Sequence, residues 1–271
     1  MIARLTFPVY LSLGTYRIHP HAFFDALAYL AGFGVYLLLR RGSKDTLPGP
    51  LRLAMVAAAT AGATLGAKLL FILEDPELTR HSMQSPAYWL GGKTIVGALL
   101  GGLIAVEAIK HYIGIKQSTG DLYAVALALG IAIGRIGCFL TGLSDNTYGT
   151  PTSLPWGVDF GDGIRRHPTQ LYEIAFLVAL IPALLSIMRR MGVSHRFQSG
   201  DVFKFFMVSY LAFRLLCDFI KPYPPVVLGL GTIQWACVFG LLYYANDVGR
   251  WVLPGSNAFT APISGDQPKP L

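Results

Sequence analysis

Seven apolar stretches, each long enough to cross a lipid bilayer, constrain what this chain can fold into. A membrane-spanning helix needs about 20 largely apolar residues. Charged residues make up only 14% of the 271 residues, against about 25% in a typical soluble domain. We therefore predict an all-α fold: a polytopic membrane protein, built as a bundle of about seven transmembrane helices. The predicted spans are residues 21–40, 51–73, 88–109, 120–141, 169–188, 201–220 and 226–246.

The loops between these spans predict the orientation in the membrane. Most of their Lys and Arg residues fall on the side that also holds the C-terminus, as in Arg40-Arg41 and Arg189-Arg190. Because cytoplasmic loops carry an excess of basic residues, we expect a periplasmic N-terminus and a cytoplasmic C-terminus. The net charge of +7 then reflects this bias and attraction to anionic lipids, and no nucleic-acid partner is expected.

We predict one transmembrane domain over residues 1–250, with a periplasmic segment at about 142–168 that is too long to be a simple turn. Residues 251–271, rich in Pro, Gly and Ser, are expected to form a disordered cytoplasmic tail. Small residues also recur at four-residue spacing, which lets helix backbones pack closely in a membrane. These rows are Ala58, Gly62 and Gly66; Gly97 and Gly101; and Gly130 and Gly134.

Two arginines lie inside predicted spans, where a charge is costly and needs a partner or a purpose. Arg135 stands between Gly134 and Gly137, and its planar guanidinium suits a lipid phosphate that the glycines allow to come close. The alternative is an arginine that snorkels or forms a salt bridge. Arg214 and Asp218 are four residues apart, on one helix face. The two charges either neutralise each other, or Arg214 binds a further anion such as a phosphate.

The run from Arg165 to Glu173 closes the long loop and opens the fifth span. Thr169, Gln170 and Glu173 place polar groups in the first turn of that helix. His167 is a candidate acid or base, because its ordinary pKa of about 6.5 is near neutrality. The alternative is simply a polar helix start at the membrane interface.

Three further polar residues are candidates for contacts with a lipid headgroup. Asp145 and Asn146 follow Arg135 by a short distance in the chain, although Asp-Asn is also ordinary turn chemistry. Asp25 lies in the first span, where it either caps a helix, pairs with an arginine or faces the headgroup.

No metal and no cofactor are expected from spacing. His19 and His21 flank a proline, but no third ligand follows at a matching distance. Cys138, Cys217 and Cys237 lie singly in apolar stretches, which indicates neither a zinc knot nor a disulfide framework.

Taken together, these motifs resemble the prolipoprotein diacylglyceryl transferase family, integral inner-membrane enzymes of bacteria. The resemblance covers most of the chain and includes Arg214 and Asp218 near its end. Its most specific motifs are Gly134-Arg135-Ile136-Gly137, Pro155-Trp156-Gly157-Val158 and Arg166-His167-Pro168-Thr169-Gln170-Leu171-Tyr172-Glu173.

The resemblance implies transfer of the diacylglyceryl group from phosphatidylglycerol to the lipobox cysteine in a prolipoprotein signal peptide, with release of glycerol phosphate. The implied catalytic residues are Arg135, Arg214, Asp218 and His167. The implied substrate-binding residues are Arg135, Gly134, Gly137, Asp145, Asn146, Gln170, Tyr172, Glu173 and Asp25.

The chain departs from the family pattern at four positions near the expected headgroup site. Val96 stands where the family usually has a His before the glycines of the third span. Cys138 and Thr141 replace asparagines, and Asp25 replaces a tyrosine. The alternative function is therefore a divergent paralogue that binds phospholipid without catalysis or with a different specificity.

Overall fold

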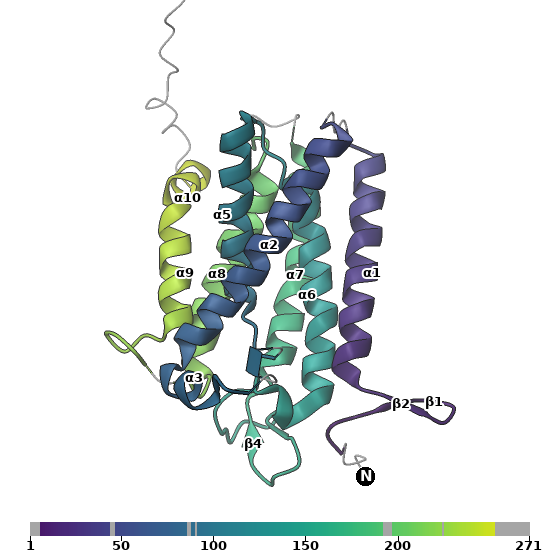
Figure 1. Ribbon diagram of the computed structural model, residues 1–271, viewed down its shortest axis with the longest axis vertical. Coiled ribbons are helices and arrows are strands. Elements are labelled where there is room, and N and C mark those ends of the chain that lie inside the picture. The colour runs from purple at the N-terminus through teal and green to yellow at the C-terminus, as the bar shows by residue number, and fades with distance from the viewer. Residues whose placement is uncertain are drawn as a thin grey trace, which may run out of the picture.

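The computed structural model describes residues 6–43, 47–85, 88–89, 91–191, 197–223 and 225–252, apart from the side chains of Leu13 and Leu78. Long helices run along the vertical axis of Figure 1, and short hairpins gather at its lower end. Five helices are long and apolar enough to span a membrane. They are α1 (Pro20–Arg41), α2 (Gly49–Glu74), α5 (Ile95–Ile113), α6 (Asp121–Thr141) and α7 (Thr169–Arg190).

The remaining elements are shorter. Helices α8 (Asp201–Cys217) and α9 (Thr232–Tyr243) complete the bundle, with α10 (Ala245–Val252) at its upper end. The lower end holds α3 (Pro76–Ser82), the 3₁₀ turns η1 (Gly142–Asp145) and η2 (Asp218–Ile220), and two antiparallel hairpins. The hairpins pair β1 (Leu11–Leu13) with β2 (Tyr16–Ile18), and β3 (Val158–Asp159) with β4 (Arg165–Arg166). The all-α polytopic membrane fold is confirmed.

Two predicted spans begin too early. Helix α5 begins at Ile95, because Gly91-Gly92 form a loop and Thr94 caps the helix by accepting from the Gly97 amide. Helix α9 begins at Thr232, because residues 226–231 make a tight turn whose Gly229 has a φ of +75°. Glycine adopts that left-handed conformation without strain, so the turn replaces the first helical turns that hydropathy predicts.

The first two residues of the predicted C-terminal tail, 251 and 252, belong to helix α10. Helix α10 continues to Val252, and the Trp251 indole donates to Asp201 at the start of α8 over 3.3 Å. The same carboxylate accepts from Arg250 at 2.6 Å. Residue 251 is therefore part of the packed bundle, while the rest of the predicted tail, 253–271, lies outside the described residues.

Glycine rows join α2 to α5, as the four-residue spacing predicts. A Cβ atom on Gly66 would collide with the Gly97 carbonyl oxygen, and one on Gly62 with that of Gly101. The two helix backbones therefore touch directly, which is the close approach that small residues permit inside a membrane.

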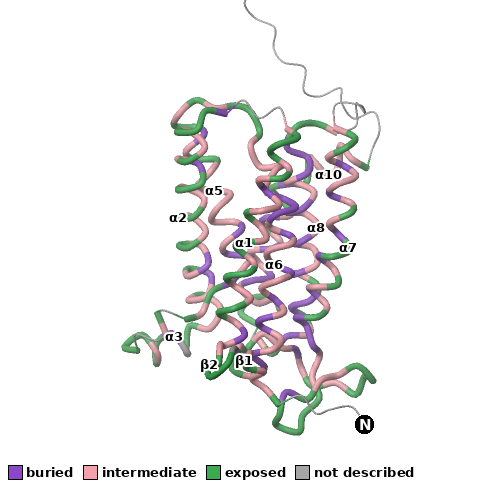
Figure 2. The backbone as a smooth tube through the Cα atoms, turned by 90° about the vertical axis from the view of Figure 1, so that its right-hand side faces the viewer, coloured by how far each residue is buried: buried purple, intermediate pink, exposed green. Residues whose placement is uncertain are grey.

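The core lies among α6, α7 and α8, whose facing side chains include the fully buried Leu177, Leu184, Phe206 and Tyr210. Figure 2 shows that α1 and α2 are mostly exposed or intermediate. Their outward side chains are nevertheless apolar, such as Leu30, which is 71% exposed. Such surfaces are stable against hydrocarbon rather than water.

Candidate active site

A buried cluster of ionic side chains lies where α6 and α8 end and α7 begins. We call Arg135, Glu173, Tyr210, Arg214 and Asp218 the arginine cluster. Arg135 comes from the last two turns of α6, Glu173 from the second turn of α7, and the other three from the end of α8 and from η2. Each of these side chains is at least nine-tenths buried.

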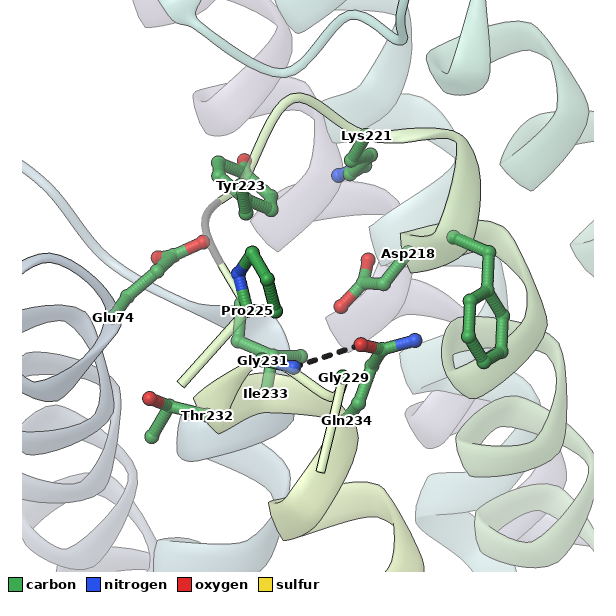
Figure 3. A pocket seen from close by; sticks show the side chains of 11 residues that line it. Glu74, Asp218, Lys221, Tyr223, Pro225, Gly229, Gly231, Thr232, Ile233 and Gln234 are labelled. Atoms are coloured by element: carbon green, nitrogen blue, oxygen red, sulfur yellow. Dashed lines mark hydrogen bonds between the residues drawn. The ribbon is translucent and has the colours of Figure 1, made fainter. Parts of the chain in front are cut away.

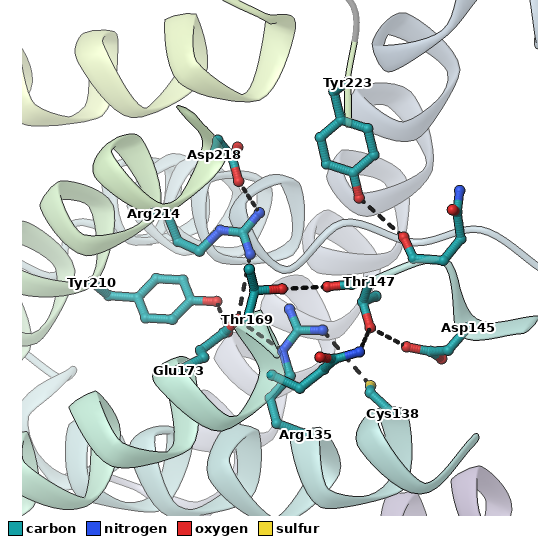
Figure 4. Close-up of polar contacts among 12 residues, drawn as sticks. Arg135, Cys138, Asp145, Thr147, Thr169, Glu173, Tyr210, Arg214, Asp218 and Tyr223 are labelled. Atoms are coloured by element: carbon teal, nitrogen blue, oxygen red, sulfur yellow. Dashed lines mark hydrogen bonds and ion pairs between the residues drawn. The ribbon is translucent and has the colours of Figure 1, made fainter. Parts of the chain in front are cut away.

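Glu173 stands at the centre of the arginine cluster (Figure 4). Its Oε2 lies 3.0 Å from Arg135 Nε and 3.3 Å from Arg214 Nη1, while its Oε1 accepts from the Tyr210 hydroxyl at 2.6 Å. Arg214 also donates to Asp218 over 2.7 Å. The two arginines thus share one carboxylate, so they face a common site rather than opposite sides of the bundle.

Several buried polar atoms in this region have no hydrogen-bond partner within the described residues. They are Arg135 Nε, which has only its ion-pair contact, Arg214 Nε, Gln170 Oε1 and Asp218 Oδ2. Buried polar groups are normally paired. Unsatisfied guanidinium donors at a shared site are typical of a place that receives an anion.

A pocket of about 120 Å³ adjoins the arginine cluster. Its walls include Asp218, Lys221 and Gln234, and Glu74 at the end of α2 lies opposite (Figure 3). Lys221 is 6% exposed. Burial, together with the nearby arginines, lowers its pKa to about 8. A buried ammonium is thus the third cation at this site.

The first turn of α7 is held by the loop that precedes it. Thr169 donates its hydroxyl to the Thr147 carbonyl, and the Gln170 amide donates to the Thr147 hydroxyl at 3.1 Å. Thr147 in turn donates to Asp145. The loop after α6 therefore fixes the helix that carries Glu173.

A second polar cluster lies beside Arg135, on the side of α1. His21 Nδ1 is 2.9 Å from Asp25 Oδ2, and its Nε2 is 3.2 Å from Asp145 Oδ1. Cys138 accepts from Arg135 Nη1 at 3.7 Å. The sulfur, one His21 nitrogen and one Asp145 oxygen all lie within 4.8 Å of one another.

The sequence comparisons identify the family. The model of the prolipoprotein diacylglyceryl transferase family matches residues 8–248. The chain belongs to this family.

Curated relatives that carry the name phosphatidylglycerol–prolipoprotein diacylglyceryl transferase match most of the chain. The Nitrosomonas europaea protein is 32% identical over 88% of this chain and 89% of its own length. The relative from Solidesulfovibrio magneticus is 32% identical over 93% of this chain and 96% of its own length. The relative from Clostridium tetani is 32% identical over 87% of this chain and 94% of its own length.

Among the residues expected from the family motifs, the structure brings Arg135, Gln170, Glu173, Arg214 and Asp218 together at one end of the bundle. His167 and Tyr172 form a separate contact, with the ring Nδ1 3.1 Å from the tyrosine hydroxyl. The tyrosine hydroxyl also accepts from the Trp156 indole. Asn146 contributes its carbonyl oxygen, which accepts from Tyr223.

Gly137, which the sequence suggests as a place where a phosphate comes close, faces α1 in the structure. A Cβ atom there would lie 2.9 Å from Phe24 Cβ and 3.2 Å from His21 Cα. The glycine therefore lets α1 approach α6. Gly134 is less crowded, since its nearest neighbour is Asp25 Oδ1 at 3.8 Å. Asp25 pairs with His21, not with an arginine as considered above.

Val96, where the family usually has a histidine, is 1% exposed and packs in the apolar core. Three contributors to the site were missed from sequence: Tyr210, Lys221 and His21. Tyr210 lies one helical turn before Arg214, on the same face, so the spacing rule would have found it. His21 was noted only as a histidine paired in sequence with His19, and neither it nor Lys221 has a spacing that places it at this site.

Proposed function

We propose that the arginine cluster binds the phosphate of phosphatidylglycerol while its diacylglyceryl group is transferred to a prolipoprotein cysteine. The observation that carries this proposal is that two buried guanidinium groups, Arg135 and Arg214, share the single carboxylate of Glu173, while Arg214 Nε has no hydrogen-bond partner among the described residues. Lys221 adds a third buried cation beside them. A phosphodiester anion satisfies these donors and balances this charge.

The reaction forms a thioether. The acceptor thiol loses its proton to water on the outer side, because the thiolate is the nucleophile. Its sulfur then attacks the glycerol carbon that carries the phosphate. The carbon–sulfur bond forms as the carbon–oxygen bond breaks, and glycerol phosphate leaves with one more negative charge on its phosphate. The guanidinium groups of Arg135 and Arg214 stabilise that developing charge, which is the form of electrostatic catalysis that contributes most in buried sites.

We further propose that the site faces the periplasm from the outer half of a bacterial plasma membrane. The lower end of the bundle in Figure 1 carries α3 and the hairpins. The arginine cluster lies where α6 ends and α7 begins, which is the same end. The bias of basic residues favours a cytoplasmic opposite end. The acceptor is then the lipobox cysteine of a signal peptide that reaches the outer surface. His167 and Tyr172 lie in this end as well and are proposed to contact that peptide rather than the phosphate.

The test is transfer by the purified full chain in phosphatidylglycerol vesicles, with a synthetic lipobox peptide as acceptor. We expect a lipidated peptide from the Cys form of the peptide and none from its Ser form. Arg135→Ala or Arg214→Ala should lower the rate at least about 100-fold, as loss of one oxyanion donor does. Arg189→Ala is the matched control, since that arginine is exposed at the far end of α7.

Two results would overturn the proposal: no lipid on the peptide under any of these conditions, or full transfer by Arg135→Ala. Phosphatidylglycerol bound tightly without transfer would identify a phospholipid-binding protein on this scaffold. Complementation of a bacterial strain that lacks the transferase tests whether the chain performs the complete reaction in cells.

A further inference from the structure

Three side chains with metal-binding donors meet beside the arginine cluster. His21 lies in the first turn of α1, Cys138 in the last turn of α6, and Asp145 at the end of η1. One nitrogen, one sulfur and one oxygen from these residues lie within 4.8 Å of one another. Two of the positions where this chain departs from the family pattern, Cys138 and Asp25, belong to this cluster or touch it directly.

The close packing of α1 on α6 creates this cluster. Gly137 has no side chain, so Pro20, His21 and Phe24 of α1 approach it closely. His21 is thereby placed next to the residue that follows Gly137, which is Cys138. The arrangement is part of the helix contact and does not depend on a long flexible loop.

The donor set is that of a zinc site. Zinc binds imidazole nitrogen, thiolate sulfur and carboxylate oxygen, and a catalytic zinc ion has three protein ligands and one open position. With zinc–ligand distances of about 2.0–2.3 Å, tetrahedral ligand atoms are about 3.3–3.6 Å apart. His21 Nε2 and Asp145 Oδ1 are already 3.2 Å apart, and the Cys138 sulfur lies within 4.8 Å of a ligand atom of each residue.

The surroundings of the three ligands support the same assignment. If Nε2 of His21 binds the metal, its Nδ1 hydrogen points to Asp25 at 2.9 Å, and a carboxylate in that place orients metal-binding histidines. Asp145 accepts from the Thr147 hydroxyl through its other oxygen, Oδ2. Each of these two ligands therefore has a partner that fixes its orientation.

The charges are also compatible. A cysteine that binds zinc does so as a thiolate. Arg135 Nη1 is 3.7 Å from the Cys138 sulfur. Zn²⁺ with one thiolate and one carboxylate carries no net charge, so it does not repel this arginine.

We propose that His21, Cys138 and Asp145 bind a zinc ion whose open position takes the thiol of the acceptor peptide. The second half of this statement rests on the proposed function. A thiol that binds zinc loses its proton, which here passes to water on the outer side. The site thus supplies the thiolate that the reaction needs next to the phosphate held by Arg135. The zinc–sulfur bond breaks as the carbon–sulfur bond forms.

The first test measures metal in the full chain purified in detergent and dialysed against Zn²⁺. We expect one zinc per protein, and an absorption band from thiolate bound to cobalt when Co²⁺ replaces zinc. His21→Ala, Cys138→Ser and Asp145→Asn should lose both signals. His19→Ala and Cys217→Ser are the matched controls and should keep them. Asp25→Asn should weaken binding about 10–100-fold, as loss of an orienting carboxylate does.

The proposal is overturned if the parent chain binds no stoichiometric metal, or if Cys138→Ser keeps both the zinc and the cobalt band. Melting temperatures in detergent close to those of His19→Ala and Cys217→Ser show that these variants are folded. A cluster in which His21 only bridges two carboxylates gives no cobalt band at all.

A second measurement separates this proposal from the transfer reaction. Addition of the lipobox peptide to the cobalt form should shift the band when the peptide carries Cys and not when it carries Ser. Transfer by a metal-free chain would refute the role of zinc in activating the thiol while leaving the transferase function intact. Stoichiometric zinc without transfer would refute the transferase function and leave the zinc site intact.

Discussion

Replacing Glu173 by Gln removes the carboxylate that touches both arginines while preserving the size of the side chain. The Glu173 side chain is 2% exposed, so the positive charges left behind stay buried. Breaking a buried ion pair by removing one partner costs about 3–5 kcal/mol. Arg214 keeps its contact with Asp218 at 2.7 Å, and Arg135 is the side chain that loses its carboxylate. We therefore expect the lower end of that range, about 3 kcal/mol.

Thermal unfolding of the purified protein in detergent, followed by circular dichroism, measures this loss. A protein of this size loses about 2–4 °C in Tm per kcal/mol, so Glu173→Gln should unfold about 6–12 °C lower. The control is Glu77→Gln, the same change on exposed helix α3, which should cost less than about 0.5 kcal/mol.

Phosphatidylglycerol should restore stability to Glu173→Gln more than to the parent chain, because the phosphate takes over part of the missing charge. A ligand at 100 times its Kd stabilises by about 2.7 kcal/mol. Zwitterionic lipid should not do so. Equal melting temperatures for Glu173→Gln and Glu77→Gln would refute the claim that this carboxylate balances the buried arginines.

Three further predictions concern other parts of the molecule. The pKa of Lys221 is lowered by burial and by nearby arginines from 10.5 to about 8, so the folded chain holds this proton less tightly than the unfolded chain. Burying the charged lysine therefore lowers the free energy of unfolding below pH 8, and this loss disappears as the pH rises toward 10.5. Unfolding in lipid-free detergent should show stability rising between these pH values. Lys221→Met should flatten the rise. Gly66→Ala places a methyl group against the α5 backbone and should lower the stability by about 1–3 kcal/mol. The control is Gly34→Ala in α1, where a Cβ meets nothing within 4 Å, and it should leave Tm nearly unchanged. Equal shifts in Tm would contradict direct packing of the α2 and α5 backbones. Arg250→Ala leaves the buried Asp201 without its guanidinium and should cost about 3 kcal/mol in the same melting assay, so an unchanged Tm would count against a packed α10.

The sequence predicted the membrane fold well because hydropathy over some 20 residues is a strong signal. It failed at the starts of α5 and α9, where the chain remains apolar but Gly91, Gly92 and Gly229 impose turns. Hydropathy averages over such residues, so a turn inside an apolar stretch is invisible to it.

The two arginines at the site were also predictable, because each charge inside a span demands a partner. The contact of Glu173 with both arginines was not predictable from sequence, because Glu173 is equally consistent with an ordinary polar residue in the first turns of α7. The cluster of His21, Cys138 and Asp145 was missed for a different reason. Its members come from α1, α6 and η1, and the helix contact at Gly137 that joins them leaves no local pattern in the chain.

The carboxylate between the arginines has a consequence for how tightly each species on the reaction path is held. In the proposed site, a lipid phosphodiester has a single negative charge and must compete with Glu173 for guanidinium groups that this carboxylate already contacts, so the lipid is bound weakly before the reaction. The departing phosphate gains a second charge and competes better. Only contacts that strengthen toward the transition state raise the rate. Competition from the Glu173 carboxylate therefore makes the site bind the transition state more tightly than the lipid substrate.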